Sequence, residues 1–333
     1  MIEFGKFVDS IRDSVSTHLY QLVVLECDLM TELRLVWDVF TMARGELFHA
    51  FIQLADSRLC TPTTVSTQHD TNQAWINAIN QLCSDTEEQM SDQLLTRVSV
   101  IVSRDQAHVP GWDQLSLQYA VPWPLHLIIT PQTLEKYNAI FRFLLLARRT
   151  QSALHSLWSV NMFRNKSARR QMQSNTGEVD TVSQTRQHMI FLIDNLQYYL
   201  MADVLDTRIS GLKNKLSKTQ SFEDVKIYHD QFLTQIQASI FLFNDPVHKC
   251  LVDTMNVCLK FCCSSSLSSQ QALSTAFSQH SFLLLKLLSS LRHQMAPTSL
   301  AQLLTRIDYN RYFSKKEKKS FVPNTGDTSS DRN

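Results

Sequence analysis

Glycine is the residue that most restricts the fold of this sequence, because only 6 of its 333 residues are glycine. Folds rich in β-sheet use glycine in their turns and bulges, so this scarcity favours long helices joined by few connections. Apolar residues recur at helical spacing from the first turn onward. One such face contains Phe4, Phe7, Val8, Ile11, Val15 and Leu19. We therefore predict an all-α fold, a multi-helix bundle with long antiparallel helices.

The helical pattern also predicts the individual helices and some of their caps. The expected helices cover residues 3–19, 20–42, 45–59, 70–82, 131–163, 182–216, 221–242, 247–264, 272–295 and 300–310. Asp70 is the expected N-cap of its helix, and Ser221 with Asp224 matches a loose capping box. The centre of the helix over residues 182–216, MIFLIDNLQYYLMADVL, is apolar nearly all round, which predicts burial on two sides.

One region departs from the helical period. Residues 94–103, LLTRVSVIVS, are rich in β-branched side chains, and residues 112–121, WDQLSLQYAV, alternate between apolar and polar. Because turn residues lie between these two segments, we predict one small β-hairpin over residues 94–121.

Three prolines in VPWPLHLIITPQTLEKYNAIFRFLL mark the change from hairpin to helix. Pro122 ends the second strand because proline has no N–H to donate to a β-ladder. Pro124 keeps Trp123 extended. Thr130 and Pro131 are a helix start, since the threonine hydroxyl can cap free amides and proline loses no hydrogen bond at the first helical position. The helix that follows is expected to extend as far as Phe163.

Charge and hydropathy exclude several classes of partner. The net charge is +1 and 19% of residues are charged, so no strong field draws the chain to nucleic acid or to an anionic membrane. The basic runs RRTQ, ARRQ and SKKEKK have no stacking aromatic residue among them and are interpreted as solvated faces or tails. No uninterrupted apolar run approaches 18 residues, and the N-terminal residues do not resemble a signal peptide. We expect no membrane and no nucleic-acid partner.

The chain also lacks the residue patterns of common active sites. Its 7 cysteines are odd in number and irregular in spacing, which is typical of reduced core residues. The CLKFCC segment has a metal-like spacing from Cys258 to Cys262, but no second pair completes a ligand set. His229 beside Asp230 lacks an accompanying nucleophile. We predict that the chain is not an enzyme and has no metal, cofactor or small-molecule substrate.

Two polar clusters have two possible interpretations each. In DNLQYYLMAD, the residues Asp194, Asn195, Gln197 and Asp203 lie within an apolar helix. They either form an internal hydrogen-bond network or face a partner, because burial without partners costs a few kcal/mol each. In ARGELFHAF, the break at Arg44 and Gly45 is either a tight corner between helices or a surface that displays Arg44 and Glu46.

Several segments together resemble the C-terminal domain of the γ-tubulin complex proteins, the Spc or GRIP-domain family. The family pattern Y-x-V-x-W-P-L, followed by a T-P-x-x-L-x-K-Y-N segment and a later tryptophan, is matched by Tyr119, Val121, Trp123, Pro124, Leu125, Leu134, Lys136, Tyr137, Asn138, Phe141, Leu144, Leu145 and Trp158. Further matches are residues 44–52, 188–206, 221–233 and 300–313. The ending LAQLLTRIDYNRYF and the hairpin region resemble one component of the family more than the others.

The resemblance implies a non-catalytic helical platform that binds γ-tubulin and helps to nucleate microtubules. Residues 1–313 would form the γ-tubulin-binding domain (helices over residues 1–84, the hairpin over 94–121 and a long-helix bundle over 131–313), and residues 314–333 a disordered tail. The family's N-terminal domain for lateral assembly would be absent. GTP would belong to γ-tubulin, and the other partners would be further γ-tubulin complex components. The alternative function is a helical tether or adaptor that does not bind γ-tubulin.

The same resemblance implies a location in the cytoplasm and cytoskeleton, at microtubule-organising centres such as centrosomes and spindle poles. It also suggests where γ-tubulin would bind. The candidate contact residues are Arg44, Glu46, Phe48, Asn195, Tyr198, Asp203, Asp224, His229 and Asp230. A platform of this kind needs a wide interface, on the order of 1,000 Å², with a few anchoring residues.

Overall fold

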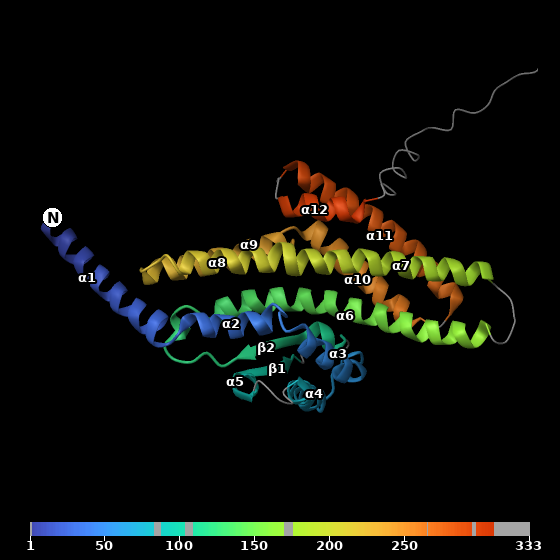
Figure 1. The fold of residues 1–333 in the computed structure, drawn as a ribbon, viewed down its shortest axis with the longest axis horizontal. Helices are drawn as coiled ribbons and strands as arrows, with labels where there is room; N and C mark the ends of the chain where they lie inside the picture. Colours follow the sequence, from blue (N-terminus) through green and yellow to red (C-terminus); the bar gives the residue numbers. More distant parts are fainter. Residues whose placement is uncertain are drawn as a thin grey trace, which may run out of the picture. The chain divides into compact units, whose positions relative to one another are not determined.

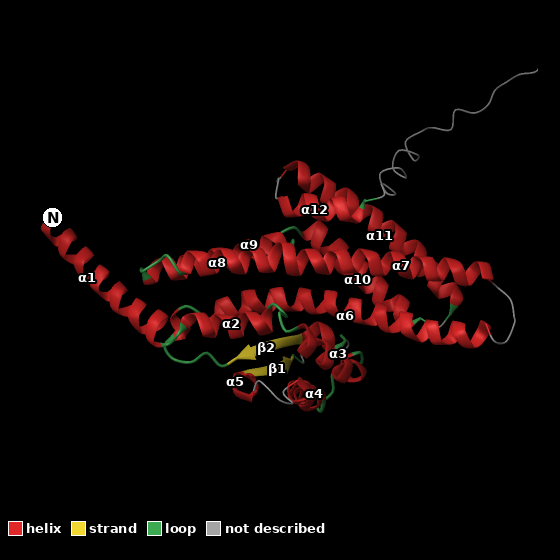
Figure 2. Cartoon of the chain, in the orientation of Figure 1, coloured by secondary structure: helices red, strands yellow, loops and turns green. Residues whose placement is uncertain are grey.

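The computed structural model describes residues 2–82, 88–103, 109–169, 176–264, 266–294 and 298–309. The tail expected over residues 314–333 lies outside them. The chain divides into two compact units. Unit 1 contains Met1–Ser156 and Leu200–Asp245, and unit 2 contains Leu157–Tyr199 and Pro246–Asn333. The described chain is helical apart from its loops and one two-stranded sheet, so the all-α prediction is confirmed (Figures 1 and 2).

Unit 1 contains the small sheet together with helices. In chain order they are α1 (Ile2–Tyr20), the π-helical turn η1 (Gln21–Glu26), α2 (Leu29–Phe40), α3 (Gly45–Leu59), α4 (Thr67–Leu82), α5 (Glu88–Arg97), β1 (Val98–Val102), the 3-10 turn η2 (Gly111–Gln114), β2 (Leu115–Tyr119), the 3-10 turn η3 (Leu125–Leu127), the first part of α6 (Pro131–Arg169), the π-helical segment η4 (Tyr199–Asp206), α8 (Thr207–Leu216) and α9 (Phe222–Ser239).

Unit 2 is built from helices alone in its described part. It contains the end of α6, α7 (Thr176–Tyr198), α10 (Asp245–Cys263), α11 (Leu267–Gln294) and α12 (Thr298–Ile307). Within it, α7 packs against α11 and α12. A hydroxyl pair between Thr185 and Ser274, 2.7 Å apart, joins α7 to α11.

The predicted hairpin is present, although Trp112, Asp113 and Gln114 of the predicted second strand lie in the 3-10 turn η2. The outer edges of the hairpin are closed by side chains. β1 and β2 pair antiparallel, with Val98 opposite Tyr119 and Val102 opposite Leu115. On the free edge of β1, Gln68 of α4 donates to the carbonyl of Val100 (2.6 Å) and accepts from the N–H of Val102 (2.8 Å). On the free edge of β2, Asn138 of α6 makes the same pair of bonds with the backbone of Leu117, at 2.8 and 2.9 Å. Asn72 of α4 also accepts from the N–H of Val100 at 3.1 Å, so amide side chains of α4 and α6 satisfy edges that would otherwise expose unpaired backbone groups.

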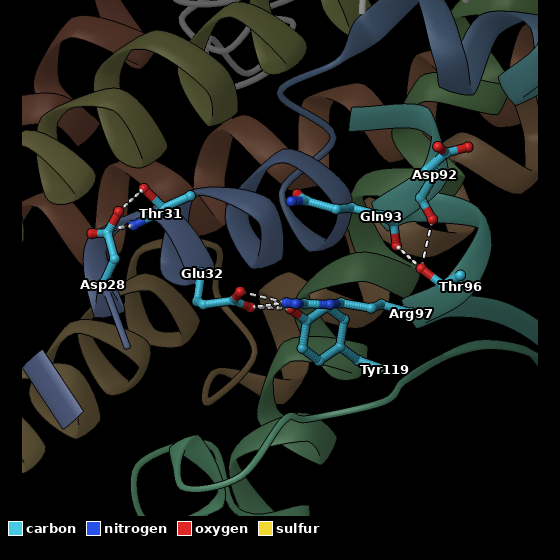
Figure 3. A network of polar contacts seen from close by, with 8 residues as sticks. All are labelled: Asp28, Thr31, Glu32, Asp92, Gln93, Thr96, Arg97 and Tyr119. Atoms are coloured by element: carbon cyan, nitrogen blue, oxygen red, sulfur yellow. Dashed lines mark hydrogen bonds and ion pairs between the residues drawn. The ribbon is translucent and has the colours of Figure 1, made fainter. Parts of the chain in front are cut away.

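The start of the predicted first strand is helical instead, which corrects the prediction for residues 94–97. These residues form the last turn of α5, where the Thr96 hydroxyl donates to the carbonyl oxygens of Asp92 and Gln93 (Figure 3). Arg97 then contacts Glu32, a residue far away in sequence. A contact over that separation is not visible in the local period of the sequence.

The predicted helix over residues 20–42 is broken at Asp28. The backbone of Asp28 is left-handed, with φ 45°, a conformation that aspartate tolerates better than most residues. Its carboxylate caps α2 by accepting from the N–H of Thr31 at 3.4 Å and from the Thr31 hydroxyl at 2.6 Å (Figure 3).

The N-cap predicted at Asp70 is wrong, because α4 begins at Thr67 and Asp70 lies in its first turn.

The start of α6 is confirmed: the N–H of Thr133 donates to the Thr130 hydroxyl at 3.2 Å. α6 runs past the predicted end at Phe163, to Arg169. Ser221 caps α9, with its hydroxyl 3.5 Å from the N–H of Asp224.

The predicted two-sided burial of the helix over residues 182–216 is wrong in part, because Phe191 and Tyr198 are exposed on α7.

A charged network joins α2 to the hairpin. One guanidinium nitrogen of Arg97 donates to both carboxylate oxygens of Glu32, and the Tyr119 hydroxyl donates to the same carboxylate at 3.0 Å (Figure 3). Burial raises the pKa of Tyr119 to about 12, so the phenol remains a donor. Figure 3 shows that these three side chains converge from α2, the end of α5 and β2.

Glu32→Gln is expected to lower the free energy of unfolding by about 2 kcal/mol, because hydrogen bonds to a charged group are worth about 1.5–3 kcal/mol. Urea denaturation followed by tryptophan fluorescence measures the change. The matched control is Glu26→Gln, an exposed glutamate close in sequence, which should change stability by less than about 0.5 kcal/mol. Equal effects in the two variants would mean that the network adds nothing to stability.

Candidate protein-binding surfaces

The turn between α2 and α3 presents two of the predicted contact residues. α3 begins at Gly45, just after Arg44, whose Nε lies 3.4 Å from a carboxylate oxygen of Asp38. A Cβ on Gly45 would lie 2.9 Å from a guanidinium nitrogen of Arg148, so glycine lets that side chain of α6 reach the turn. Glu46 is exposed in the first turn of α3. The segment is therefore a tight helix corner that also displays both signs of charge.

Phe48 and His229 belong to the core of unit 1 rather than to its surface. Phe48 is 0% exposed, and its ring centre lies 5.8 Å from that of Trp75 and 5.9 Å from that of Phe141. His229 is 2% exposed, with Nε2 2.8 Å from the Tyr137 hydroxyl. Burial lowers the pKa of His229 to about 4. Neither side chain is available to a partner in this structure.

The outer face of α9 carries two further predicted contact residues. Asp230 is exposed and forms an ion pair with Lys136 of α6. Asp224 is half-buried in the first turn of the helix, and the exposed Ile227 lies between the two acids at three-residue spacing. Because residues three apart lie near one another on a helix, α9 presents an acidic and apolar face.

The remaining predicted contact residues lie on α7 and η4. On α7, the Asn195 amide donates to the carbonyl of Phe191 in its own helix at 2.7 Å. Tyr198 is 55% exposed, and the guanidinium carbon of Arg306 lies 4.3 Å from its ring centre. Asp203 is half-buried in η4, which belongs to unit 1. Asn195 thus bonds to its own helix, and Tyr198 contributes an aromatic surface within unit 2.

Helix α1 has an exposed apolar face. The sequence predicts that its residues share one face, but not that this face is exposed. Phe7 is 63% exposed, and Ile11 and Val15 are about half exposed. Helical spacing showed that these residues share a face, but only the structure shows that no described residue covers it. An uncovered apolar face of this kind is typical of a surface that contacts another protein segment.

The buried cysteines have the properties of core residues. Burial raises the pKa of Cys258, and it raises that of Cys262 to about 12, so both thiols stay protonated at neutral pH. A metal ligand or nucleophile requires the thiolate. Within the described ranges, no group of three or more His, Cys, Asp or Glu side chains is placed to hold a metal ion. None of the described helices combines the length and the apolar composition that a membrane span requires.

Helices α2 to α12, the edge-closing Asn138 and the network at Tyr119 all lie within a single family match. A family model described as gamma tubulin complex component C-terminal matches residues 29–313. The chain belongs to the γ-tubulin complex component family. It is 37% identical to gamma-tubulin complex component 4 of Homo sapiens over 346 residues, which cover 95% of this chain and 50% of the human protein.

Other relatives in this family agree. The chain is 37% identical to component 4 of Mus musculus, with the same coverage, and 28% identical to the component 4 homolog of Medicago truncatula, over 93% of this chain and 49% of that protein. The resemblance inferred from the sequence is confirmed, and the component that the ending and the hairpin region resemble is component 4. The chain spans about half the length of the curated relatives that it matches.

Proposed function

We propose that this chain is a non-catalytic subunit of a γ-tubulin complex, that it binds γ-tubulin, and that it helps to nucleate microtubules. The observation that carries the proposal is the family match over residues 29–313, in which component 4 relatives align with 95% of the chain. In this role the chain holds no cofactor of its own, and GTP resides on γ-tubulin. The helical core and the protonated thiols are consistent with a scaffold.

The same matches support further γ-tubulin complex components as partners and a cytoskeletal location. Relatives include a γ-tubulin complex component 2 of Mus musculus and a spindle pole body component 98 of Dictyostelium discoideum. On the basis of these relatives, we also propose that the chain acts at microtubule-organising centres, such as centrosomes and spindle poles. No nucleic acid, membrane or small-molecule substrate has a part in it.

The test is size-exclusion chromatography of the purified chain mixed with γ-tubulin. The proposal expects a complex that elutes ahead of either protein alone, at micromolar concentrations. A well-folded chain that elutes apart from γ-tubulin would instead support the alternative function, a helical tether or adaptor that does not bind γ-tubulin. Circular dichroism of the same sample establishes whether the chain is folded.

The corner of α2 and α3 is the surface that we assign to γ-tubulin first, because it presents the half-buried Arg44 and the exposed Glu46 within three residues of each other. The double variant Arg44→Ala plus Glu46→Ala is expected to weaken the complex at least tenfold, which is about 1.4 kcal/mol. A charged residue at the rim of an interface contributes less binding free energy than this. A tenfold loss of affinity would therefore indicate that Arg44 and Glu46 anchor the complex.

The matched control removes an opposite-charge pair at the other end of α3, which links α3 to α4. Arg58 of α3 and Asp70 of α4 lie 3.7 Å apart on the surface. Arg58→Ala plus Asp70→Ala should leave the affinity for γ-tubulin within about twofold. Wild-type affinity in the Arg44 and Glu46 double variant, with the fold intact, would show that the corner is not the contact.

A further inference from the structure

Helix α8 concentrates positive charge in a chain that is almost neutral overall. Between Asp206 and Glu223 the sequence has four basic residues, Arg208, Lys213, Lys215 and Lys218, and no acidic one, whereas the net charge of all 333 residues is +1. α8 packs antiparallel against α9 within unit 1; both are yellow in Figure 1.

A pocket of about 140 Å³ opens between these two helices. Its lining includes Arg208, Gly211 and Lys215 from α8, and Tyr228, Phe232 and Gln235 from α9. A pocket of this size accommodates one or two side chains rather than a folded surface. It is therefore suited to a short peptide segment.

Gly211 lies in the wall of the pocket, on the exposed side of α8. A Cβ at this position would have no heavy atom within 4 Å, so close packing does not explain the glycine. Glycine within a helix costs about 1 kcal/mol relative to alanine. Without a side chain at this position, the backbone of α8 is accessible to a ligand in the pocket.

The two cations of the pocket are held by uncharged partners. Arg208 donates to the side-chain oxygen of Gln235 at 3.2 Å, and the ammonium of Lys215 lies 5.3 Å from the centre of the Tyr228 ring. Neither cation forms an ion pair with any carboxylate in the described part of the chain. An amide and an aromatic face orient a cation without neutralising it, so both charges are available to an anionic ligand.

The spacing of these contacts determines the kind of anion that fits. Arg208 and Lys215 are seven residues apart, or about 10 Å along α8, and their partners Gln235 and Tyr228 are also seven apart on α9. Two carboxylates four residues apart on an extended peptide lie on the same face, about 13 Å apart, since a strand rises about 3.3 Å per residue and its side chains alternate between faces. The residue midway between them shares that face, and the long side chains of Arg208 and Lys215 can reach both carboxylates.

We propose that the pocket between α8 and α9 is a docking site for an acidic peptide segment of a partner protein. One carboxylate pairs with Arg208 and the other with Lys215. An apolar side chain between them enters the space over Gly211, against Phe232. This site is independent of the assignment of γ-tubulin to the corner at Arg44, so either proposal can fail without the other.

The test is a fluorescence anisotropy titration of the full chain with a fluorescein-labelled peptide, GEGLGEG, and with its neutral counterpart, GQGLGQG. The acidic peptide is expected to bind at least tenfold more tightly, and its affinity should fall as salt is raised. Equal affinity for the two peptides, or no binding of the acidic one at millimolar concentrations, would overturn the proposal.

Three variants localise the binding. Arg208→Glu plus Lys215→Glu should weaken it at least tenfold, and Gly211→Leu should do the same with every charge in place. The matched control, Lys226→Glu plus Lys249→Glu, reverses two exposed lysines outside the pocket and should stay within about twofold of the wild type. A control that loses as much affinity as the pocket variant would mean that only net charge attracts the peptide. Inorganic phosphate that displaces the peptide at equal concentration would indicate a phosphate site instead, which also overturns the proposal.

Discussion

Phe48→Ala is expected to lower the free energy of unfolding by about 4 kcal/mol, because truncating a fully buried phenylalanine costs about 3–5 kcal/mol. Its side chain is 0% exposed and packs between Trp75 of α4 and Phe141 of α6. The cavity left by alanine removes contacts from three helices at once. Urea denaturation followed by tryptophan fluorescence measures the loss in unit 1, which contains all but one of the 5 tryptophans.

The matched control is Leu54→Ala on the same helix. Leu54 is 37% exposed, although it lies in the same apolar segment of the sequence, so its truncation should cost less than about 1 kcal/mol. Phe48→Ala also distinguishes a core role from the contact role that the sequence suggested. A variant that keeps wild-type stability but loses γ-tubulin would make Phe48 a contact residue and would contradict its burial.

Local sequence rules predicted the parts of the fold that depend on local chemistry. Thr130 caps α6 and Ser221 caps α9 because each hydroxyl needs only an amide three residues away. The hairpin register follows from alternation, which places Val100 opposite Leu117 with both buried.

The errors occur where a local cap or a distant contact overrides the hydrophobic pattern. Asp28 interrupts an amphipathic run because its left-handed backbone and capping carboxylate start a new helix. Residues 94–97 stay helical because Arg97 at the end of α5 is bound by Glu32 of α2. The spacing of apolar residues along the sequence reveals neither feature.

For the candidate site, the sequence located polar residues but not their exposure. Glu46 and Asp230 lie on the surface, whereas His229, next to Asp230 in sequence, is buried. Adjacent residues on a helix point about 100° apart, so which of them faces the core depends on the placement of the neighbouring helices. The pocket between α8 and α9 was missed for the same reason, since Arg208 and Gln235 meet only in the folded chain.

Acid is expected to destabilise unit 1 through His229. The Tyr137 hydroxyl accepts from the Trp37 indole N–H at 3.2 Å and lies 2.8 Å from Nε2 of His229, where it can donate to a neutral imidazole. Burial lowers the pKa of His229 to about 4, and the nearby charges of Asp230 and Lys136 act in opposite directions. In the unfolded chain the ordinary pKa of histidine is 6.5.

Between pH 6.5 and about 4 the unfolded chain therefore binds a proton that the folded chain does not. Stability falls as the pH is lowered through this window, by about 1.4 kcal/mol per pH unit and about 3 kcal/mol in total, and it is fully retained above pH 6.5. The measurement is urea denaturation at pH 7, 6, 5 and 4, compared with His229→Leu, which has no imidazole to titrate.

The comparison with His229→Leu separates the contribution of His229 to the pH dependence of stability from that of the carboxylates. The carboxylates titrate alike in both proteins, so their contribution cancels in the difference. The variant should be less stable than the wild type at pH 7, because Tyr137 loses its buried partner, and the difference should shrink by about 3 kcal/mol as the pH falls to 4. Parallel pH profiles would mean that His229 accepts a proton in the folded state as readily as in the unfolded chain. The hydroxyl of Tyr137 would then have to accept from both Trp37 and an imidazolium, leaving its own proton without an acceptor in a fully buried site. Because that arrangement carries a second cost, the neutral imidazole is the form that the core of unit 1 selects.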